Sequence, residues 1–215
     1  TSVDGFFGAS TVFHKNTTWA VFGQSTYEIN DKLTITGGLR YTYDEKSLVV
    51  GEQNVDGFAV VIGAASVQDY ADINVDDGKL SYEVSLHYAI DSDTAVFARY
   101  ANGFRAQTIQ GRDVAFEGAP SVADAETINS IEVGFKSDLL EDTLRLNAAA
   151  FYYVIDDLQL SAIGGGANNT ALINADQARG YGFEVDVQYV PHDQLVFTAG
   201  YSYNNTSIND RALSV

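Results

Sequence analysis

The 215-residue sequence predicts an all-β fold, namely an antiparallel transmembrane β-barrel segment of about eight strands. Three observations predict it. Apolar and polar residues alternate over segments of roughly ten residues, the length that a tilted strand needs to cross a bilayer. No helical pattern separates these segments. Short and long connections between these segments alternate strictly along the chain, as in outer-membrane barrels.

The first two strands show the alternation best. Within the segment from Lys32 to Glu45, the odd-numbered positions 33–43 carry Leu, Ile, Gly and Tyr, whereas Thr, Gly, Arg and Asp occupy the even-numbered positions 34–44. The segment from Trp19 to Ile29 repeats the pattern with more noise. Because successive side chains of a strand point to opposite faces, each segment has one apolar face and one polar face.

The same pattern predicts six further strands. They are expected at residues 79–90, 95–103, 127–137, 144–160, 178–189 and 195–204. In the first of these, Leu80 and Tyr82 alternate with Ser81 and Glu83. The phase is lost near Phe151, but the polarity of the flanking residues still indicates a strand.

The connections fall into two kinds. Short ones are expected near residues 30–31, 91–93, 138–142 and 191–193, and longer ones at 46–78, 104–126 and 161–177. Outer-membrane barrels have short periplasmic turns and longer external loops, whereas a soluble β-sandwich has no reason to separate the two. Both chain ends then lie on the long-loop side. We therefore expect an internal piece of a larger barrel, with a small self-closed barrel as the alternative.

Tyrosine and tryptophan lie where two membrane interfaces would place them. Tyr27, Tyr88 and Tyr189 fall at the short-turn ends of their strands. At the long-loop ends fall Trp19, Tyr41, Tyr43, Tyr82, Tyr100, Tyr152, Tyr181, Tyr201 and Tyr203. Both residue types favour the membrane–water interface, so the sequence predicts an aromatic belt at each rim. For any single tyrosine, its general frequency in strands is an equally good explanation.

Composition argues against several other classes of protein. The 29 acidic and 12 basic residues give a formal net charge of −17, which would repel a nucleic-acid backbone. With no cysteine, the chain can form neither a disulfide nor a thiolate metal site. The longest near-apolar run, Phe58 to Val67, is about half of what a membrane-spanning helix needs.

Ordered strings along nearly the whole chain resemble the barrel of TonB-dependent outer-membrane receptors. The strings are Trp19–Gln24, Leu33–Tyr41, Phe97–Ala106, Glu126–Lys136, Leu144–Tyr152 and Gly180–Glu184. The resemblance implies that residues 1–215 are a segment of a barrel of about 22 strands with a plugged lumen. No plug domain is recognisable here. We therefore expect the plug, and the region that contacts the TonB coupling protein, outside this sequence.

The resemblance also implies a function and its partners. It implies an active-transport receptor in the bacterial outer membrane, energised through TonB, for a scarce small-molecule chelate, most commonly an iron–siderophore complex. Cobalamin, other metal chelates and oligosaccharides are further cargo classes, and outer-membrane lipid and lipopolysaccharide would surround the barrel. Two alternatives stay open: a passive porin or small structural barrel, and a secreted all-β binding module. No catalytic constellation or cofactor motif is visible, so we expect no enzymatic activity.

Charged residues on the polar faces are the expected lumen-facing groups. They are Glu28, Arg40, Asp44, Glu83, Arg99, Glu132, Lys136, Arg145, Glu184 and Asp186. We expect them to pair across the wall or to hold a plug, rather than to contact ligand. Gly134 and Gly182 are expected to admit a close neighbour. Ligand contacts are expected instead in the loop after the fourth strand, where charges and rings suit an anionic or aromatic chelate. The candidates are Phe104, Arg105, Gln107, Arg112 and Phe116.

No metal site is expected. Asp72–Gly78, with Glu83 in the twelfth position, is similar to a calcium-binding loop, but its glycine is one place late and the segment enters a strand. An acidic, solvated external loop is the favoured interpretation. His14, His87 and His192 are too scattered for a recognisable metal-ligand pattern.

Overall fold

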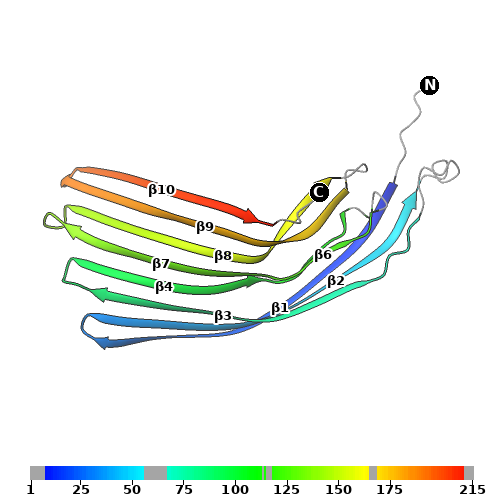
Figure 1. Ribbon diagram of the computed structural model, residues 1–215, viewed down its shortest axis with the longest axis horizontal. Helices are drawn as coiled ribbons and strands as arrows, with labels where there is room; N and C mark the ends of the chain where they lie inside the picture. The colour runs from blue at the N-terminus through cyan, green and yellow to red at the C-terminus, as the bar shows by residue number, and fades with distance from the viewer. Residues whose placement is uncertain (1–7, 56–66, 113, 115–117, 165–168, 211–215) are drawn as a thin grey trace, which may run out of the picture.

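The computed structural model describes residues 8–55, 67–112, 114, 118–164 and 169–210, and it confirms the all-β prediction. One antiparallel sheet has eight strands in the order β1-β2-β3-β4-β7-β8-β9-β10 (Figure 1). Its strands are β1 (Gly8–Asn30), β2 (Leu33–Val55), β3 (Ile73–Ala89), β4 (Thr94–Arg105), β7 (Glu126–Leu139), β8 (Leu144–Gly164), β9 (Asn169–His192) and β10 (Leu195–Asn209). Each strand of this sheet pairs with the next one along the chain, so the sheet is a meander.

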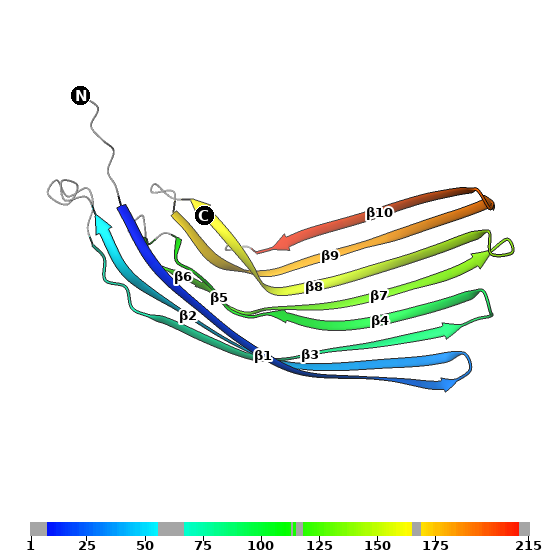
Figure 2. The ribbon, with the colours of Figure 1, turned by 180° about the vertical axis from the view of Figure 1, so that it is seen from behind.

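The sheet is open at both edges. Within the described residues, β1 pairs only with β2 and β10 pairs only with β9. Figure 2 shows the two edge strands far apart on either side of a curved sheet. An eight-strand barrel closed on itself would pair β1 with β10. The structure is therefore a partial barrel.

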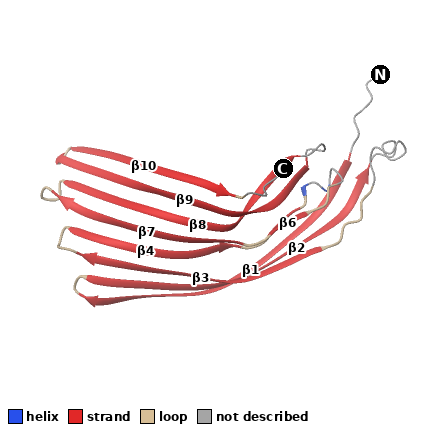
Figure 3. Ribbon diagram, viewed as in Figure 1, coloured by secondary structure: helices blue, strands red, loops and turns tan. Residues whose placement is uncertain are grey.

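Short turns gather at one end of the sheet and the longer connections at the other (Figure 3). The turn between β1 and β2 is fixed by Asn30, whose Oδ1 accepts hydrogen bonds from the backbone N–H groups of Lys32 at 2.9 Å and Leu33 at 3.0 Å. Asp91 does the same between β3 and β4, accepting from Asp93 and Thr94. These side chains mimic a backbone turn, which is why Asn and Asp favour such positions. The predicted separation of short and long connections is confirmed for the two connections β2–β3 and β4–β7, whereas β8 and β9 are joined by residues 165–168 alone, a connection no longer than the turn between β3 and β4.

The strands run further into the long-loop end than the alternation predicts. β2 continues to Val55, and β8 and β9 reach Gly164 and Asn169. The predicted loops at 46–78 and 161–177 are therefore wrong over much of their length. Alternating polarity marks only the part of a strand with an apolar environment on one side, whereas the ladder of backbone hydrogen bonds continues beyond it.

The acidic segment at residues 72–78 is one of these corrections. It was expected to be a solvated loop, but from Ile73 it belongs to β3. In the register with β2, Asp76 lies opposite Glu45 and Asp77 lies opposite Asp44. Among the described residues, no group of three or more His, Cys, Asp or Glu side chains is arranged to hold a metal ion.

A second, two-stranded sheet was missed by the sequence analysis. It consists of β5 (Thr108–Gln110) and β6 (Ser121–Ala123), both within the connection between β4 and β7. Each strand has three residues, too few for an alternation to be recognised. We use the name inner hairpin for β5, β6 and the described residues between them (111, 112, 114 and 118–120), because this segment lies on one face of the large sheet with β2 on one side and β9 on the other (Figure 2).

The apolar side chains of the alternating segments are exposed. Leu86 is 43% exposed, Ile131 50% and Tyr201 62%. Among the described residues, the well-buried apolar side chains instead lie at or beneath the inner hairpin, as do Leu48, Ile109 and Ala123. Aromatic pairs lie at two levels of the sheet: Tyr189 stacks on Phe197 near the short turns with ring centroids 6.5 Å apart, and Trp19 stacks on Tyr43 at 5.8 Å about midway along β1 and β2. No helix among the described residues is long and apolar enough to span a membrane.

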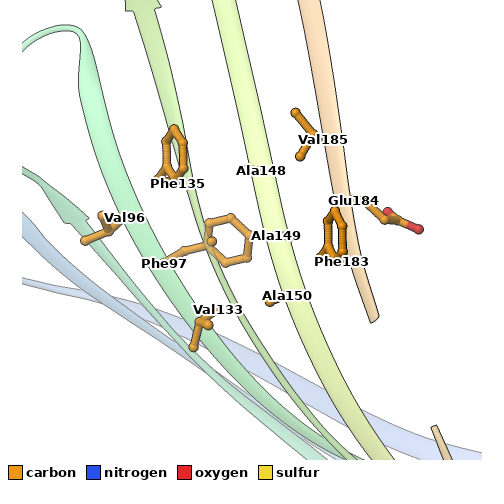
Figure 4. A pocket seen from close by; sticks show the side chains of 11 residues that line it. Val96, Phe97, Val133, Phe135, Ala148, Ala149, Ala150, Phe183, Glu184 and Val185 are labelled. Atoms are coloured by element: carbon orange, nitrogen blue, oxygen red, sulfur yellow. The ribbon is translucent and has the colours of Figure 1, made fainter. Parts of the chain in front are cut away.

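The exposed apolar face is not smooth. On β8, the small side chains of Ala148 and Ala150 lie between Phe135 on β7 and Phe183 on β9 (Figure 4). They leave a shallow hollow of about 480 Å³ whose lining is mainly apolar. Such a hollow suits hydrocarbon rather than a polar ligand, so the candidate functional site lies on the other face.

Candidate functional site

The predicted lumen-facing charges share one face of the sheet. Residues opposite each other in a ladder point to the same side, and so do residues two apart on one strand. Following the register from β2 to β9 places these charges together: Arg40, Asp44, Glu83, Arg99, Glu132, Lys136, Arg145, Glu184 and Asp186. We call this side the inner face and the exposed apolar side the outer face.

Some of these charges pair along the wall. Arg99 Nη2 lies 2.6 Å from Glu83 Oε2, and Arg145 Nε lies 2.7 Å from Asp138 Oδ1. Both pairs are substantially exposed, so screening by water leaves each of them only a small contribution to stability. Other cations lie on aromatic rings, Arg40 on Phe22 and Lys136 on Phe97. By contrast, Glu132, Glu184 and Asp186 make no ion pair with any described residue.

Aromatic rings cover glycines on the inner face. Phe97 lies opposite Gly134, and Phe151 lies opposite Gly182. At either glycine, a Cβ atom would overlap the facing ring. The prediction that Gly134 and Gly182 admit a close neighbour is therefore confirmed. Each ring lies across the neighbouring backbone because the glycine has no side chain there.

Hydrogen bonds hold the inner hairpin against the large sheet on two sides. On the β2–β3 side, Lys46 Nζ donates to the carbonyl oxygen of Gln107 at 2.6 Å, and the Gln107 N–H donates to Asp77 Oδ2 at 2.7 Å. Lys46 also pairs with the largely buried carboxylate of Asp44 at 2.7 Å. These two bonds hold the residue just before β5.

Gln159 on β8 fastens the hairpin on the opposite side. Its Nε2 donates to the carbonyl oxygens of Ala106 and Asp124, both at 2.9 Å, and its Oε1 accepts from the Thr108 hydroxyl at 2.7 Å. One side-chain amide thus holds the chain just before β5 and just after β6. Gln159 is only 7% exposed, so these bonds are shielded from competing water.

Asn174 on β9 lies directly opposite Gln159 and repeats the arrangement. It accepts from the Asp124 N–H at 2.7 Å and donates to the Asp124 carbonyl oxygen at 2.9 Å. Nearby, the Leu172 N–H donates to Ser121 Oγ at 2.9 Å. The sequence analysis missed both amides, because Gln and Asn are ordinary residues for the polar face of a strand.

A cavity lies between the inner hairpin and the β1–β2 wall. It measures about 380 Å³. The hairpin contributes Ile109, Gly111 and Arg112, and the wall contributes His14 and Leu48, among others. Arg112 is exposed, and its Nη1 donates to Thr170 Oγ1 at 2.7 Å. The arrangement can bind a small ligand group by a guanidinium, an imidazole and an apolar floor.

The structure describes four of the five predicted ligand-binding residues, and it does not bring these four together. Phe104 shares the outer face with Tyr100, whereas Arg105 lies on the inner face opposite Glu126. The backbone of Gln107 is hydrogen-bonded to the wall, and among the four described residues only Arg112 lines the cavity. Phe116 lies outside the described residues. Whether any of these side chains binds ligand remains a prediction.

Comparison with known proteins supports one family. Residues 1–214 match the family described as TonB dependent receptor-like, beta-barrel. An uncharacterised TonB-dependent receptor of Haemophilus influenzae is 26% identical over 195 residues, covering 89% of this chain and 49% of the relative. The rhizobactin receptor of Rhizobium meliloti is 26% identical over 162 residues, covering 65% and 20% respectively. The chain thus spans about half or less of these curated relatives.

Solved structures agree on the fold. The ferric yersiniabactin uptake receptor of Yersinia pestis superposes with a TM-score of 0.72 at 19% identity, covering 94% of this chain and 29% of that one. The alcaligin outer-membrane receptor of Bordetella pertussis gives 0.59 at 19% identity, covering 92% and 31%. The open sheet therefore corresponds to part of a larger barrel. Taken with the match over residues 1–214, this shows that the chain belongs to the TonB-dependent receptor family of outer-membrane proteins, as part of the β-barrel.

Proposed function

We propose that this chain forms part of the wall of an outer-membrane receptor that imports an iron–siderophore complex and is energised through TonB. The observation that carries the proposal is the family match along the whole chain, together with relatives and structural neighbours named as receptors for rhizobactin, ferric yersiniabactin and alcaligin. The polar inner face, with its hairpin near the long-loop rim, is a suitable surface for a hydrophilic chelate.

The proposed roles divide between the two faces. The outer face contacts lipid and lipopolysaccharide through its apolar side chains and aromatic belts. On the inner face, carboxylates without an ion-pair partner, such as Glu132 and Glu184, are available to bond a plug. The plug and the region that contacts TonB belong, in this proposal, to other parts of the intact receptor.

Iron uptake tests the proposal directly. Cells that carry the intact receptor, cells that lack it and cells that lack TonB are grown under iron limitation with radioactive ferric chelates. We expect uptake of at least one chelate to require both the receptor and TonB. Uptake that needs the receptor but not TonB would instead support a passive porin. Receptor-dependent uptake restricted to non-iron cargo would refute the assignment to iron.

A further inference from the structure

The cavity between the inner hairpin and the β1–β2 wall has the features of a built site. Its volume of about 380 Å³ falls within the range of small-molecule sites. Leu48 and Ile109 form a nearly dry floor, since they are 2% and 6% exposed. At Gly111 the hairpin approaches the wall so closely that a Cβ atom would lie 2.8 Å from Leu48 Cδ1. The hairpin and the β1–β2 wall are therefore in close contact at Gly111, and the cavity lies beside this contact.

The described lining of the cavity differs in charge from the acidic protein as a whole. The chain has a formal net charge of −17, yet Arg112 and His14 line this cavity, and no Asp or Glu does so within the described residues. Nη1 of Arg112 donates to Thr170 Oγ1, which leaves the other N–H groups of this exposed guanidinium available. A guanidinium held by one bond is oriented for charge-assisted bonds to an anion.

The cavity depends on the position of the inner hairpin, because residues of the hairpin form one of its walls. Each hairpin strand has three residues, and an isolated two-stranded hairpin is marginal in water. Its position is fixed mainly by side-chain hydrogen bonds from the large sheet, and Gln159 holds both of its ends. Arg112 lies two residues after the end of β5, so its position depends on these hydrogen bonds.

We propose that this cavity binds an anionic group of the transported ligand, with Arg112 as the contact residue and Gln159 as the positioning residue that keeps the cavity formed. The inference rests on the proposed function for the nature of the ligand. It adds a selectivity: anionic chelates are bound in preference to neutral chelates of similar size.

Binding to the intact receptor in detergent tests the contact residue. Three probes are used: a strongly anionic ferric tris-catecholate, a neutral ferric trihydroxamate and iron-free citrate. We expect Arg112→Ala to weaken binding of the tris-catecholate by about 10-fold or more and of citrate by a similar factor, while neutral-chelate binding changes less than about two-fold. Arg179→Ala is the matched control. Arg179 is also exposed and makes one side-chain hydrogen bond, to Gln177, but it lies on the outer face.

The positioning role needs a readout other than affinity. Ala123, the last residue of β6, is fully buried, and the chain has no native cysteine, so Ala123→Cys reports hairpin opening through its rate of maleimide labelling. We expect Gln159→Ala to raise this rate about 10-fold and to weaken tris-catecholate binding. A disulfide between Ser121→Cys and Leu172→Cys spans positions whose Cα atoms lie within roughly 7 Å, given the 2.9 Å bond between them. It should restore affinity in the Gln159→Ala receptor.

Each result supports or overturns a defined claim. If Arg112→Ala changes binding of all three probes equally or not at all, the anion site is refuted. If the disulfide fails to restore affinity, Gln159 has no positioning role. If the receptor binds citrate through Arg112 but neither iron chelate, the iron assignment fails and the anion site stands. If the receptor binds no probe, both are refuted.

Discussion

The short-turn half and the long-loop half of the sheet are built from the same strands but are stabilised differently. Towards the short turns, strands such as β3 and β10 bury little, and their apolar residues are exposed on the outer face. Towards the long loops, the inner face is covered by the hairpin, and Leu48, Ile109 and Ala178 are nearly fully buried. The first half depends on lipid as its solvent, and the second has a small core of its own. One ladder of strands can therefore pass from one environment to the other without a break.

The largest expected effect is a charge placed on the outer face of the short-turn half. Val84→Lys puts an ammonium into hydrocarbon between the belts, which should cost about 2–4 kcal/mol of folding free energy. The free energy is measured by urea unfolding of the intact receptor in lipid vesicles. Ser85→Lys, one residue further and on the inner face, is the control and should cost much less. Equal costs would contradict the assignment of the two faces.

A methyl group beneath an aromatic ring should have the next largest effect. Gly182→Ala would bring a Cβ atom into the ring of Phe151 and the backbone of Tyr203, so we expect a loss of about 1–3 kcal/mol from overpacking. Gly37→Ala is the control, because a Cβ at Gly37 meets nothing within 4 Å. The same unfolding assay applies. If both variants unfold at the wild-type urea concentration, the close packing on the inner face is not significant for stability.

A smaller, local effect is expected in the long-loop half. Asn174→Ala leaves the backbone N–H of Asp124 without its side-chain acceptor and removes one of the two side-chain donors to the Asp124 carbonyl oxygen, which should favour local opening of the hairpin by about 1–2 kcal/mol. Hydrogen exchange should then accelerate in the segment around β6 while the ladders of β1 to β4 keep their protection. Acceleration spread over the whole sheet would show that the hairpin is not a separate unit.

The smallest expected effect is that of an exposed ion pair. A double-mutant cycle with Glu83→Gln and Arg99→Gln should give a coupling energy below about 1 kcal/mol that declines as salt is added, because both side chains are well exposed. A coupling well above this value would mean that the pair is desolvated in the intact receptor, as contact with a plug would cause.

How much of the fold the sequence predicts depends on the strength of each local signal. In β2, residues 33–43 alternate without exception on the apolar side, so the strand, its two faces and its short turn were all predicted. The continuation to Val55 was not, because polar residues there occupy both faces. The alternation along each strand predicted that Arg99 and Glu132 lie on the inner face. The register between β4 and β7 then shows that the two residues lie opposite each other.

The candidate site was much less predictable. Arg112 was selected for its charge, but nothing near it in the sequence indicates a cavity with His14, nearly one hundred residues away along the chain. Gln159 lies in a predicted strand without any motif. Its role arises because the connection between β4 and β7 folds back over the sheet, which brings Ala106 and Asp124 to the same amide.

The sequence by itself determined which residues face lipid, because a period of two is a property of the extended chain and needs no tertiary contact to be recognised. Only the tertiary structure decided where the connection between β4 and β7 lies. Three-residue strands carry no periodic signal, and their position is selected by hydrogen bonds to strands that are distant in sequence.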